Sequence, residues 1–300
     1  MELSKYKKQK NGKIRFLKKF ILKIFLFFLA FGFLFLFFLF FFDLLSNTNS
    51  PAVIFFDVGQ GDAMLLRNIG GKNILIDGGP DNLVIKKLGK FLPYFSRRLD
   101  FVIISHSHDD HVVGLVETFR RYKIENLILA EGLKSGATQD LLLSLVLGEG
   151  NKTKIIYFND RAEYNLGFCN LIFLNPNILA MPENDNNSLI TKLDCPNLDF
   201  LFSGDNELAV EKALLEAGDL LTELEVDLRA KVFKASHHGS KTSNSYEFLK
   251  MINPDIFIIS AGLNNRFNHP AQEIVERVSQ LGLEIKRTDI GGDFIFPLDF

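Results

Sequence analysis

The pattern of hydrophobic and polar positions divides this chain into one long apolar stretch near the N-terminus and many short segments after it. Residues 24–42 are 19 positions without a charge, and nearly all of them are Phe, Leu or Ile. As a helix, this stretch rises about 28 Å, roughly the hydrocarbon thickness of a bilayer. A buried helix of a soluble domain would carry a polar stripe, and this stretch has none. The pattern predicts one transmembrane helix, which we place at residues 24–45.

The flanks of this helix predict its orientation. Residues 1–23 form a basic leader, and residues 46–51 form a short polar linker. The positive-inside rule places the leader in the cytoplasm and everything after residue 45 on the extracytoplasmic side. A cleaved signal peptide also begins with a basic segment, but its apolar region is normally shorter. Because no small-x-small cleavage site precedes Ser46, we favour an uncleaved, single-pass anchor in the cell membrane.

Residues 52–300 show strands alternating with helices. Strands are expected at residues 53–56, 63–67, 73–76, 101–104, 127–130, 155–158, 169–174, 189–193, 200–202, 232–235 and 256–259. Helices are expected at residues 82–95, 112–122, 138–147, 208–217, 246–252 and 272–281. Two blocks of several strands, each interleaved with helices, indicate one α/β domain of layered sheets with helices outside.

The formal net charge of −2 hides an uneven distribution. Residues 1–50 hold nine Lys and Arg against two acidic residues, so the remaining 250 carry 25 basic and 34 acidic groups, a balance of −9. Non-specific affinity for nucleic acid comes mostly from Lys and Arg. The body of the protein should therefore bind nucleic acid weakly unless its cleft is locally basic.

The chain has two cysteines, Cys169 and Cys195. Two cysteines cannot form a cysteine-rich zinc cluster, and neither belongs to a C-x-x-C pair. A disulfide between them would be compatible with an oxidising side of a membrane, and the sequence supplies no geometry that decides it.

Candidate chemistry gathers where the apolar strand 101–104 ends. Three histidines and two aspartates follow it within six residues: His106, His108, Asp109, Asp110 and His111. In extended backbone the rings of His106 and His108 point to the same side, because they are two positions apart. Imidazole and carboxylate together suit zinc, with manganese or iron as alternatives. The cluster predicts a metal site at the end of this strand, with Asp109 as a helix cap or a residue behind the ligands.

Other candidate ligands follow later strands. Asp205 comes directly after the strand at 200–202 and a Ser-Gly pair, where a carboxylate can bridge metals. His237 and His238 follow the strand at 232–235, and His269 follows the strand at 256–259. Because His237 and His238 face opposite sides of an extended backbone, the sequence leaves open which of them is a ligand.

These motifs resemble the metallo-β-lactamase superfamily. The H-x-H-x-D-H cluster is preceded by Leu-Ile-Asp-Gly-Gly at 75–79 and followed by Gly204-Asp205. Three further motifs, FDVGQGD at 56–62, KASHHGSKTS at 234–243 and NNRFNHP at 264–270, are similar to the C-terminal hydrolase domain of ComEC-type DNA-uptake competence proteins. The resemblance runs from about residue 53 to the end and does not include the multi-helix channel domain of those proteins.

The resemblance implies a four-layer αββα sandwich, preceded here by one transmembrane helix, with two divalent metal ions in the cleft between its sheets. Zn²⁺ is the expected metal, and Mn²⁺ is an alternative. The implied ligands are His106 and His108 for the first ion, Asp110 and His111 for the second, Asp205 as the bridge, and one of His237 and His238.

The chain departs from the family pattern at one ligand. Many members place another histidine between the first cluster and the bridging aspartate, and this chain has none from residue 112 to 236. The equivalent region is the polar loop 183–188, which contains Asn187. The first metal is therefore expected to be held more weakly or to be completed by water.

Three other groups of residues have expected roles. Asp57, Asp62 and Asp77 are candidates for orienting the ligands from behind. Candidates for contacting substrate are Ser240, Lys241, Thr242, Asn187 and His269. Arg266 is a further candidate to line the cleft.

The expected activity is metal-dependent hydrolysis of a phosphodiester. Two divalent ions lower the pKa of a bridging water and generate hydroxide near neutral pH. Asp110 would orient that nucleophile as ligand or base, with His237 and His238 as further catalytic candidates. The resemblance points to DNA as substrate, in a nuclease with a separate channel protein as a candidate partner.

Two alternatives remain open. One is a phosphodiesterase of the cell envelope that acts on a small ester of phosphocholine or a nucleotide. The other is a non-catalytic, metal-stabilised module of a DNA-uptake complex.

Overall fold

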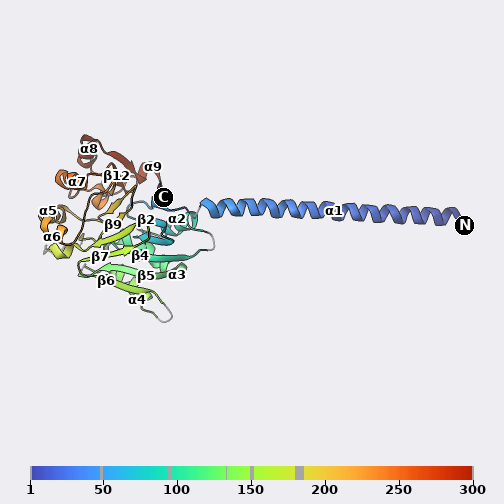
Figure 1. Cartoon of the computed structure of the whole chain (residues 1–300), viewed down its shortest axis with the longest axis horizontal. Helices are drawn as coiled ribbons and strands as arrows, with labels where there is room; N and C mark the ends of the chain where they lie inside the picture. The colour runs from blue at the N-terminus through green and yellow to red at the C-terminus, as the bar shows by residue number, and fades with distance from the viewer. Residues whose placement is uncertain are drawn as a thin grey trace. The chain divides into compact units, whose positions relative to one another are not determined.

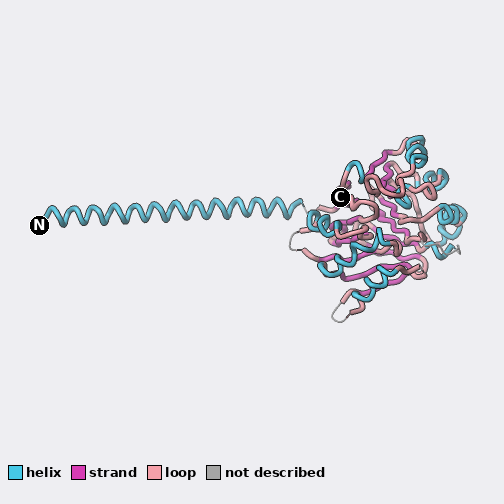
Figure 2. The backbone as a smooth tube through the Cα atoms, turned by 180° about the vertical axis from the view of Figure 1, so that it is seen from behind, coloured by secondary structure: helices cyan, strands magenta, loops and turns pink. Residues whose placement is uncertain are grey.

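The structure, a computed structural model, describes residues 2–47, 50–93, 96–132, 134–148, 152–179 and 186–298. It divides into two compact units, residues 1–48 and residues 49–300. The first unit is one continuous helix, α1 (Glu2–Asn47), so the basic leader is helical as well (Figure 2). Within α1, Leu17–Phe42 is the one stretch in the described part of the chain that is long and apolar enough to cross a membrane, with a mean hydropathy of 2.9. A signal sequence near an N-terminus meets the same criterion.

The second unit contains two seven-stranded mixed sheets among its described residues. The first sheet has the order β14-β1-β2-β3-β4-β5-β6 and the second has the order β13-β12-β11-β10-β9-β8-β7. The strands of the first sheet are β1 (Ala52–Phe55), β2 (Met64–Ile69), β3 (Lys72–Ile76), β4 (Arg98–Ile103), β5 (Lys123–Ala130), β6 (Lys154–Phe158) and β14 (Phe294–Pro297). Those of the second are β7 (Arg161–Asn165), β8 (Asn170–Leu174), β9 (Ile190–Asp194), β10 (Phe200–Phe202), β11 (Val232–Lys234), β12 (Ile256–Ile259) and β13 (Glu284–Arg287).

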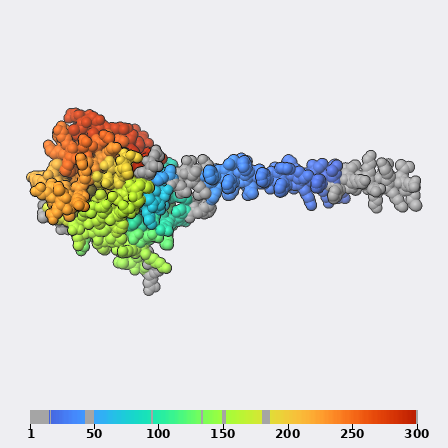
Figure 3. Space-filling view, in the orientation of Figure 1, coloured from blue at the N-terminus to red at the C-terminus, as the bar shows by residue number. Residues whose placement is uncertain are grey.

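Helices cover the outer face of each sheet. On the first sheet these are α2 (Leu83–Phe91), α3 (Asp109–Arg121) and α4 (Ala137–Val146). On the second they are α5 (Leu208–Glu216), α6 (Gly218–Glu223), α7 (Tyr246–Ile252) and α8 (Gln272–Gln280). The two groups lie on opposite sides of the strands (Figure 1), and the residues of the second group form one orange-to-red face (Figure 3). Three short helices complete the described elements: α9 (Thr288–Gly291), η1 (Pro176–Leu179) and η2 (Ser236–Gly239).

Alternation along the strands explains why both faces of each sheet are buried. In β1, Val53 and Phe55 point into the core between the sheets, where they join Phe200 and Phe202 of β10. Ile54, between them, packs with the helices on the outside. A strand that is buried on both faces reads as a continuous apolar run, which is how these strands appear in the sequence. The predicted four-layer αββα architecture is confirmed.

Parallel pairing brings the candidate ligands to one edge of the sandwich. β3 pairs in parallel with β4, and β10 pairs in parallel with β11. The carboxyl ends of parallel strands meet at the same edge, and ligands bind there in open α/β sheets. The segments that follow these four strands carry Asp77, the histidine cluster, Asp205 and the His237–His238 pair.

Gly114 allows α3 to lie against the turn that follows β3, and we expect Gly114→Ala to move this helix. A Cβ atom at position 114 would lie 2.0 Å from the Gly78 carbonyl oxygen and 2.5 Å from that of Asp81. Neither backbone oxygen can move without displacing its segment. We therefore expect Gly114→Ala to lower the free energy of unfolding by about 3 kcal/mol. Because α3 carries Asp110 and His111, metal affinity should fall as well.

Gly89→Ala provides the matched control for this prediction. Gly89 lies in α2 with nothing within 4 Å of its added Cβ, so alanine there should be neutral or stabilising by up to about 1 kcal/mol. Chemical denaturation of both variants makes the comparison, and equal stabilities would contradict the close packing of α3.

Candidate metal centre

Two groups of side chains at this edge are arranged to hold metal ions. Asp110, His111, Asp205 and His238 form one group, and His106, His108 and Asp205 form the other. Within each group the nearest ligand atoms all lie within 4.8 Å of one another. Asp205 belongs to both groups, so its carboxylate is the one that two ions would share.

The ring nitrogens of the histidines converge on the Asp205 carboxylate. The Nε2 atom of His111 lies 3.4 Å from Asp205 Oδ1, and that of His238 lies 3.5 Å from Oδ2. His106 Nε2 is 3.8 Å from the same Oδ2 atom. Asp110 joins from the first turn of α3, with its Oδ2 atom 3.2 Å from His238 Nε2.

The residues present fit divalent cations. Among the described residues, Nε2 of His106, His111 and His238 and Oδ1 of Asp205 are buried without a hydrogen-bond partner. Buried polar atoms in folded proteins nearly always have a partner, and exceptions mark functional sites. Four carboxylates, those of Asp62, Asp77, Asp110 and Asp205, lie among these histidines, and among the described residues one of them, Asp62, pairs with a buried ammonium group, that of Lys234. The site therefore offers imidazole and carboxylate donors with an excess of negative charge, as a dimetal site requires.

Hydrogen bonds behind the ligand histidines fix their orientation. His111 Nδ1 lies 2.9 Å from Asp77 Oδ2, and Asp77 accepts bonds from the Ser105 amide at 2.8 Å and hydroxyl at 2.7 Å. His238 Nδ1 lies 2.9 Å from the carbonyl oxygen of Ser260. Such partners hold Nδ1 and leave Nε2 to the metal. Asp77 thus lies where an orienting residue is needed, and Ser105 and Ser260 are partners that the sequence did not suggest.

The backbone at the two adjacent histidines differs from the extended form assumed from the sequence. His237 has φ 49° and ψ 48°, and His238 has φ 55° and ψ 22°. Both lie in the left-handed region, which non-glycine residues seldom adopt and which concentrates at functional sites. This conformation directs both rings toward Asp205, with His237 Nε2 at 3.7 Å from Oδ2. The assumption that the two rings face opposite sides is therefore wrong.

Of the two adjacent histidines, only His238 belongs to a ligand group among the described residues. His237 is partly exposed, and its Nδ1 atom lies 3.4 Å from Glu207 Oε1. We expect His238→Ala to lower the metal content from two ions to one, and His237→Ala to retain both. Metal analysis of the two purified variants checks this, and the reverse result would assign the ligand to His237.

A buried lysine that the sequence analysis did not single out lies behind the site. Lys234, on β11, is fully buried, and its ammonium group pairs with Asp62 Oδ2. The other oxygen of Asp62 is 3.4 Å from His238 Nδ1. Burial opposes the charge of Asp62, but Lys234 and His238 outweigh it and lower the pKa of this carboxyl to about 2. The sequence pattern, a lysine inside an apolar strand shortly before two histidines, could have identified Lys234 as a candidate site residue.

The carboxylates also determine which histidines carry protons when no metal is bound. Burial opposes protonation of His111 and His238, but neighbouring carboxylates, Asp205 foremost, raise the pKa of both rings well above the usual range. For His106, burial and the positive charge of His111 outweigh Asp205, so its pKa is well below the usual range.

Metal binding at pH 7 should therefore release at least two protons per chain, because the imidazoles of His111 and His238 must be neutral to coordinate, and ionisation of a metal-bound water would add a further one. Affinity should rise with pH until both rings are deprotonated, and fall as pH drops. Isothermal titration calorimetry of the metal in buffers with different ionisation enthalpies measures this release. A binding enthalpy independent of the buffer would contradict it.

The loop at 183–188, where the sequence offers no histidine, supports Asp205 by hydrogen bonds. The Asp205 amide donates to Ser188 Oγ at 3.0 Å, and the Ser188 amide donates to Asn206 Oδ1 at 2.8 Å. Asn187, beside it, is buried. Residues 183–185 of this predicted region lie outside the described residues.

Among the residues predicted to contact substrate, Ser240 and Thr242 are held in place by hydrogen bonds, whereas Lys241 is exposed. Ser240 Oγ and Thr242 Oγ1 are 3.0 Å apart, and Thr242 donates to Glu207 Oε1 at 2.8 Å, so this set reaches the carboxylate beside His237. Lys241, between them, is exposed. The ring of His269 lies 5.4 Å from that of His237, and burial together with His238 and His237 lowers its pKa to about 4.

Two aspartates of the motifs accept hydrogen bonds from residues other than the ligand histidines. Asp57 accepts a hydrogen bond from the Gly59 amide at 3.3 Å, in the turn after β1. Asp109 is the first residue of α3, where it is exposed and accepts a bond from Thr138 at 2.5 Å.

A four-layer αββα sandwich with clustered His and Asp side chains at one edge is typical of one class of metal-binding proteins. The family model described as Metallo-beta-lactamase superfamily matches residues 56–262. The chain belongs to this superfamily, as its motifs predicted, and its cluster is typical of the dimetal sites found there.

Individual proteins with similar sequences show which members of the superfamily this chain resembles. The chain is 27% identical over 258 residues to ComE operon protein 3 of Bacillus subtilis, covering 80% of this chain and 32% of that protein. It is 25% identical over 255 residues to Competence protein ComA of Neisseria gonorrhoeae, covering 83% of this chain and 33% of that protein. The chain thus spans about a third of the length of these relatives. Among solved structures, the metallo-β-lactamase fold protein YhfI of Bacillus subtilis covers 82% of this chain and 99% of its own, with TM-score 0.52 and 14% identity, which shows the fold alone.

Proposed function

We propose that the protein is a metal-dependent phosphodiesterase that hydrolyses DNA. The observation that carries this proposal is the pair of ligand groups that share Asp205, with unpartnered histidine Nε2 atoms aimed at its carboxylate. Two divalent ions held there would supply a nucleophile at neutral pH and stabilise the charge of the attacked phosphate. DNA is favoured as substrate because one of the relatives is named a competence protein, and competence is the uptake of DNA.

The chain's own residues prepare the site for this reaction. Asp77 and the Ser260 carbonyl hold His111 and His238 with Nε2 toward the centre. Asp110 is the most accessible of the ligand carboxylates, with 29% of its side chain exposed, so it is placed to contact an incoming substrate. His111 and His238 together raise the fraction of Asp110 that is ionised, since they help to lower the pKa of its carboxyl despite burial.

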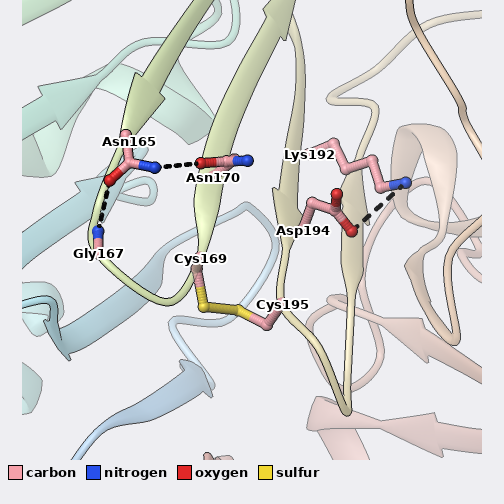
Figure 4. The surroundings of a disulfide bond; sticks show 7 residues. All are labelled: Asn165, Gly167, Cys169, Asn170, Lys192, Asp194 and Cys195. Atoms are coloured by element: carbon pink, nitrogen blue, oxygen red, sulfur yellow. Dashed lines mark hydrogen bonds and ion pairs between the residues drawn. A yellow bond between two sulfur atoms is a disulfide. The ribbon is translucent and has the colours of Figure 1, made fainter.

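We place the hydrolase unit on the extracytoplasmic side, anchored by α1. The disulfide between Cys169 and Cys195 supports this placement. The two residues lie just outside the β8–β9 ladder, next to its last pair Asn170 and Asp194, with Cα atoms 4.4 Å apart (Figure 4). Disulfides persist in oxidising compartments and are rare in the cytoplasm.

A small phosphoester of the cell envelope is the second candidate substrate. The acidic balance of residues 51–300 favours it, because strong non-specific binding of DNA needs more Lys and Arg.

The test uses the full chain in detergent, loaded with Zn²⁺ or Mn²⁺. Bound metal is quantified, and hydrolysis of bis(p-nitrophenyl) phosphate, single-stranded DNA and duplex DNA is measured for wild type and Asp110→Asn. Asp140→Asn, an exposed aspartate of α4, is the matched control. Two ions and Asp110-dependent cleavage of DNA are expected. Cleavage of the small diester alone would favour the envelope substrate, and fewer than two ions without hydrolysis would favour a non-catalytic module.

A further inference from the structure

A cavity of about 450 Å³ opens beside the metal ligand Asp110. Gln60 and Pro80 line it from the segments after β1 and β3, and Arg266 and Phe267 line it from the segment after β12. The ligand-group histidines do not line it, so the cavity adjoins the metal centre and shares only Asp110 with it among the described residues.

The segment that carries Phe267 is held rigidly by one side chain. Asn265 Oδ1 accepts bonds from the amides of Phe267 at 3.1 Å and His269 at 3.0 Å. Its Nδ2 donates to the carbonyl oxygens of Gly262 at 2.9 Å and His269 at 2.5 Å. The Gly262 amide in turn donates to Gln60 Oε1 at 3.1 Å, which ties this segment to the opposite wall of the cavity. Phe267 therefore occupies a prearranged position.

Phe267 is half-exposed, with 49% of the residue accessible to solvent. The Arg266 guanidinium lies 4.7 Å from its centroid, and the His269 ring is stacked 5.8 Å away with an interplanar angle of 25°. Because Phe267 lines the cavity and is exposed, its ring is accessible to a ligand that enters the cavity. The stacked series of cation and rings is the kind of surface on which nucleobases stack.

The charges of the lining favour a base over a phosphate. Asp109 and Asp110 contribute two carboxylates, against the single positive charge of Arg266. A phosphate would be repelled by this balance unless it lay at the metal ions, whereas an uncharged planar base would not be. Since Asp110 both lines the cavity and belongs to a ligand group, a nucleotide whose phosphate is at the metals has its base within reach of Phe267.

We propose that this cavity binds one unpaired nucleobase on Phe267 and Arg266, which makes single-stranded nucleic acid the substrate class of the site. The inference rests on the proposed function and deepens it. A base inside a duplex has both faces stacked and cannot enter, so the preference is for single strands. Stacking also gives an acidic protein an affinity for nucleic acid that does not depend on an overall excess of Lys and Arg.

The test measures binding to the full chain in detergent, loaded with Zn²⁺, and every probe carries phosphorothioate linkages to suppress turnover. The probes are a single-stranded oligonucleotide containing 2-aminopurine and an abasic oligonucleotide of the same length. Phe267→Ala should weaken binding of the first probe roughly 10- to 100-fold and quench 2-aminopurine less, with little effect on the abasic probe. Phe267→Trp should retain both affinity and quenching, which separates stacking from a folding defect.

Leu263→Ala is the control, because Leu263 is 70% exposed on the same segment and does not line the cavity. Equal affinity of wild type for the two probes, or an equal loss of both in Phe267→Ala, would overturn the inference. Either result leaves the hydrolysis assay unaffected, so failure of this inference and failure of the phosphodiesterase proposal can be told apart.

Discussion

Asp205→Ala is expected to abolish the dimetal site and with it the proposed hydrolytic activity. Asp205 is the residue common to both ligand groups, and its two oxygens lie 3.4 and 3.5 Å from the Nε2 atoms of His111 and His238. Without it neither group keeps a bridging donor, and bound metal should fall from two ions per chain to at most one. We expect phosphodiester hydrolysis to fall by roughly 10³-fold, which corresponds to about 4 kcal/mol of transition-state stabilisation.

Metal analysis and kinetics on the full chain in detergent make this measurement. Asp194→Ala is the matched control, since Asp194 is an exposed aspartate at the end of β9 and should leave metal content and rate unchanged. A thermal unfolding curve of each metal-free variant identifies any general loss of folding. If Asp205→Ala binds two ions as tightly as wild type, the ligand assignment is wrong.

Lys234→Met is expected to cause the largest loss of stability among single substitutions near the site. Lys234 and Asp62 are both fully buried, and their charges pair beneath His238. Removing the ammonium leaves the carboxylate of Asp62 buried without its partner, a change that typically costs about 3–5 kcal/mol. Chemical denaturation of the metal-free protein at pH 7 measures the change.

Two further variants show whether the effect comes from the unpaired charge. Adding Asp62→Asn to Lys234→Met removes that charge and should restore most of the lost stability, so the two substitutions should be strongly non-additive. Lys231→Met, an exposed lysine just before the same strand, should cost less than about 1 kcal/mol. Additive effects of Lys234 and Asp62 would contradict the coupling.

Local sequence identified one outermost strand, β6 at Lys154–Phe158, and missed the other three, β7, β13 and β14. β7, with sequence RAEYN, and β13, with sequence EIKR, are polar because they are the outermost strands of the second sheet. β14 is short and ends in proline, and it forms only because β1 lies beside it in the folded chain. The helix expected at 82–95 ends at Phe91 instead, because Pro93 disfavours helical backbone at the residue before it.

The sequence by itself determined the family, the layered α/β fold, the long apolar helix and the H-x-H-x-D-H cluster. Each of these is a local pattern: a strand buried on both faces is continuously apolar, and ligands two residues apart at a strand end share one side. The tertiary structure decided the features that depend on segments distant in the chain. These are the left-handed backbone that turns both His237 and His238 toward Asp205, the pairing of Lys234 with Asp62, the disulfide, and the cavity at Phe267. The physical reason is that a side chain's partners are set by which strand ends meet at the shared edge of the sandwich, and no local pattern encodes that meeting.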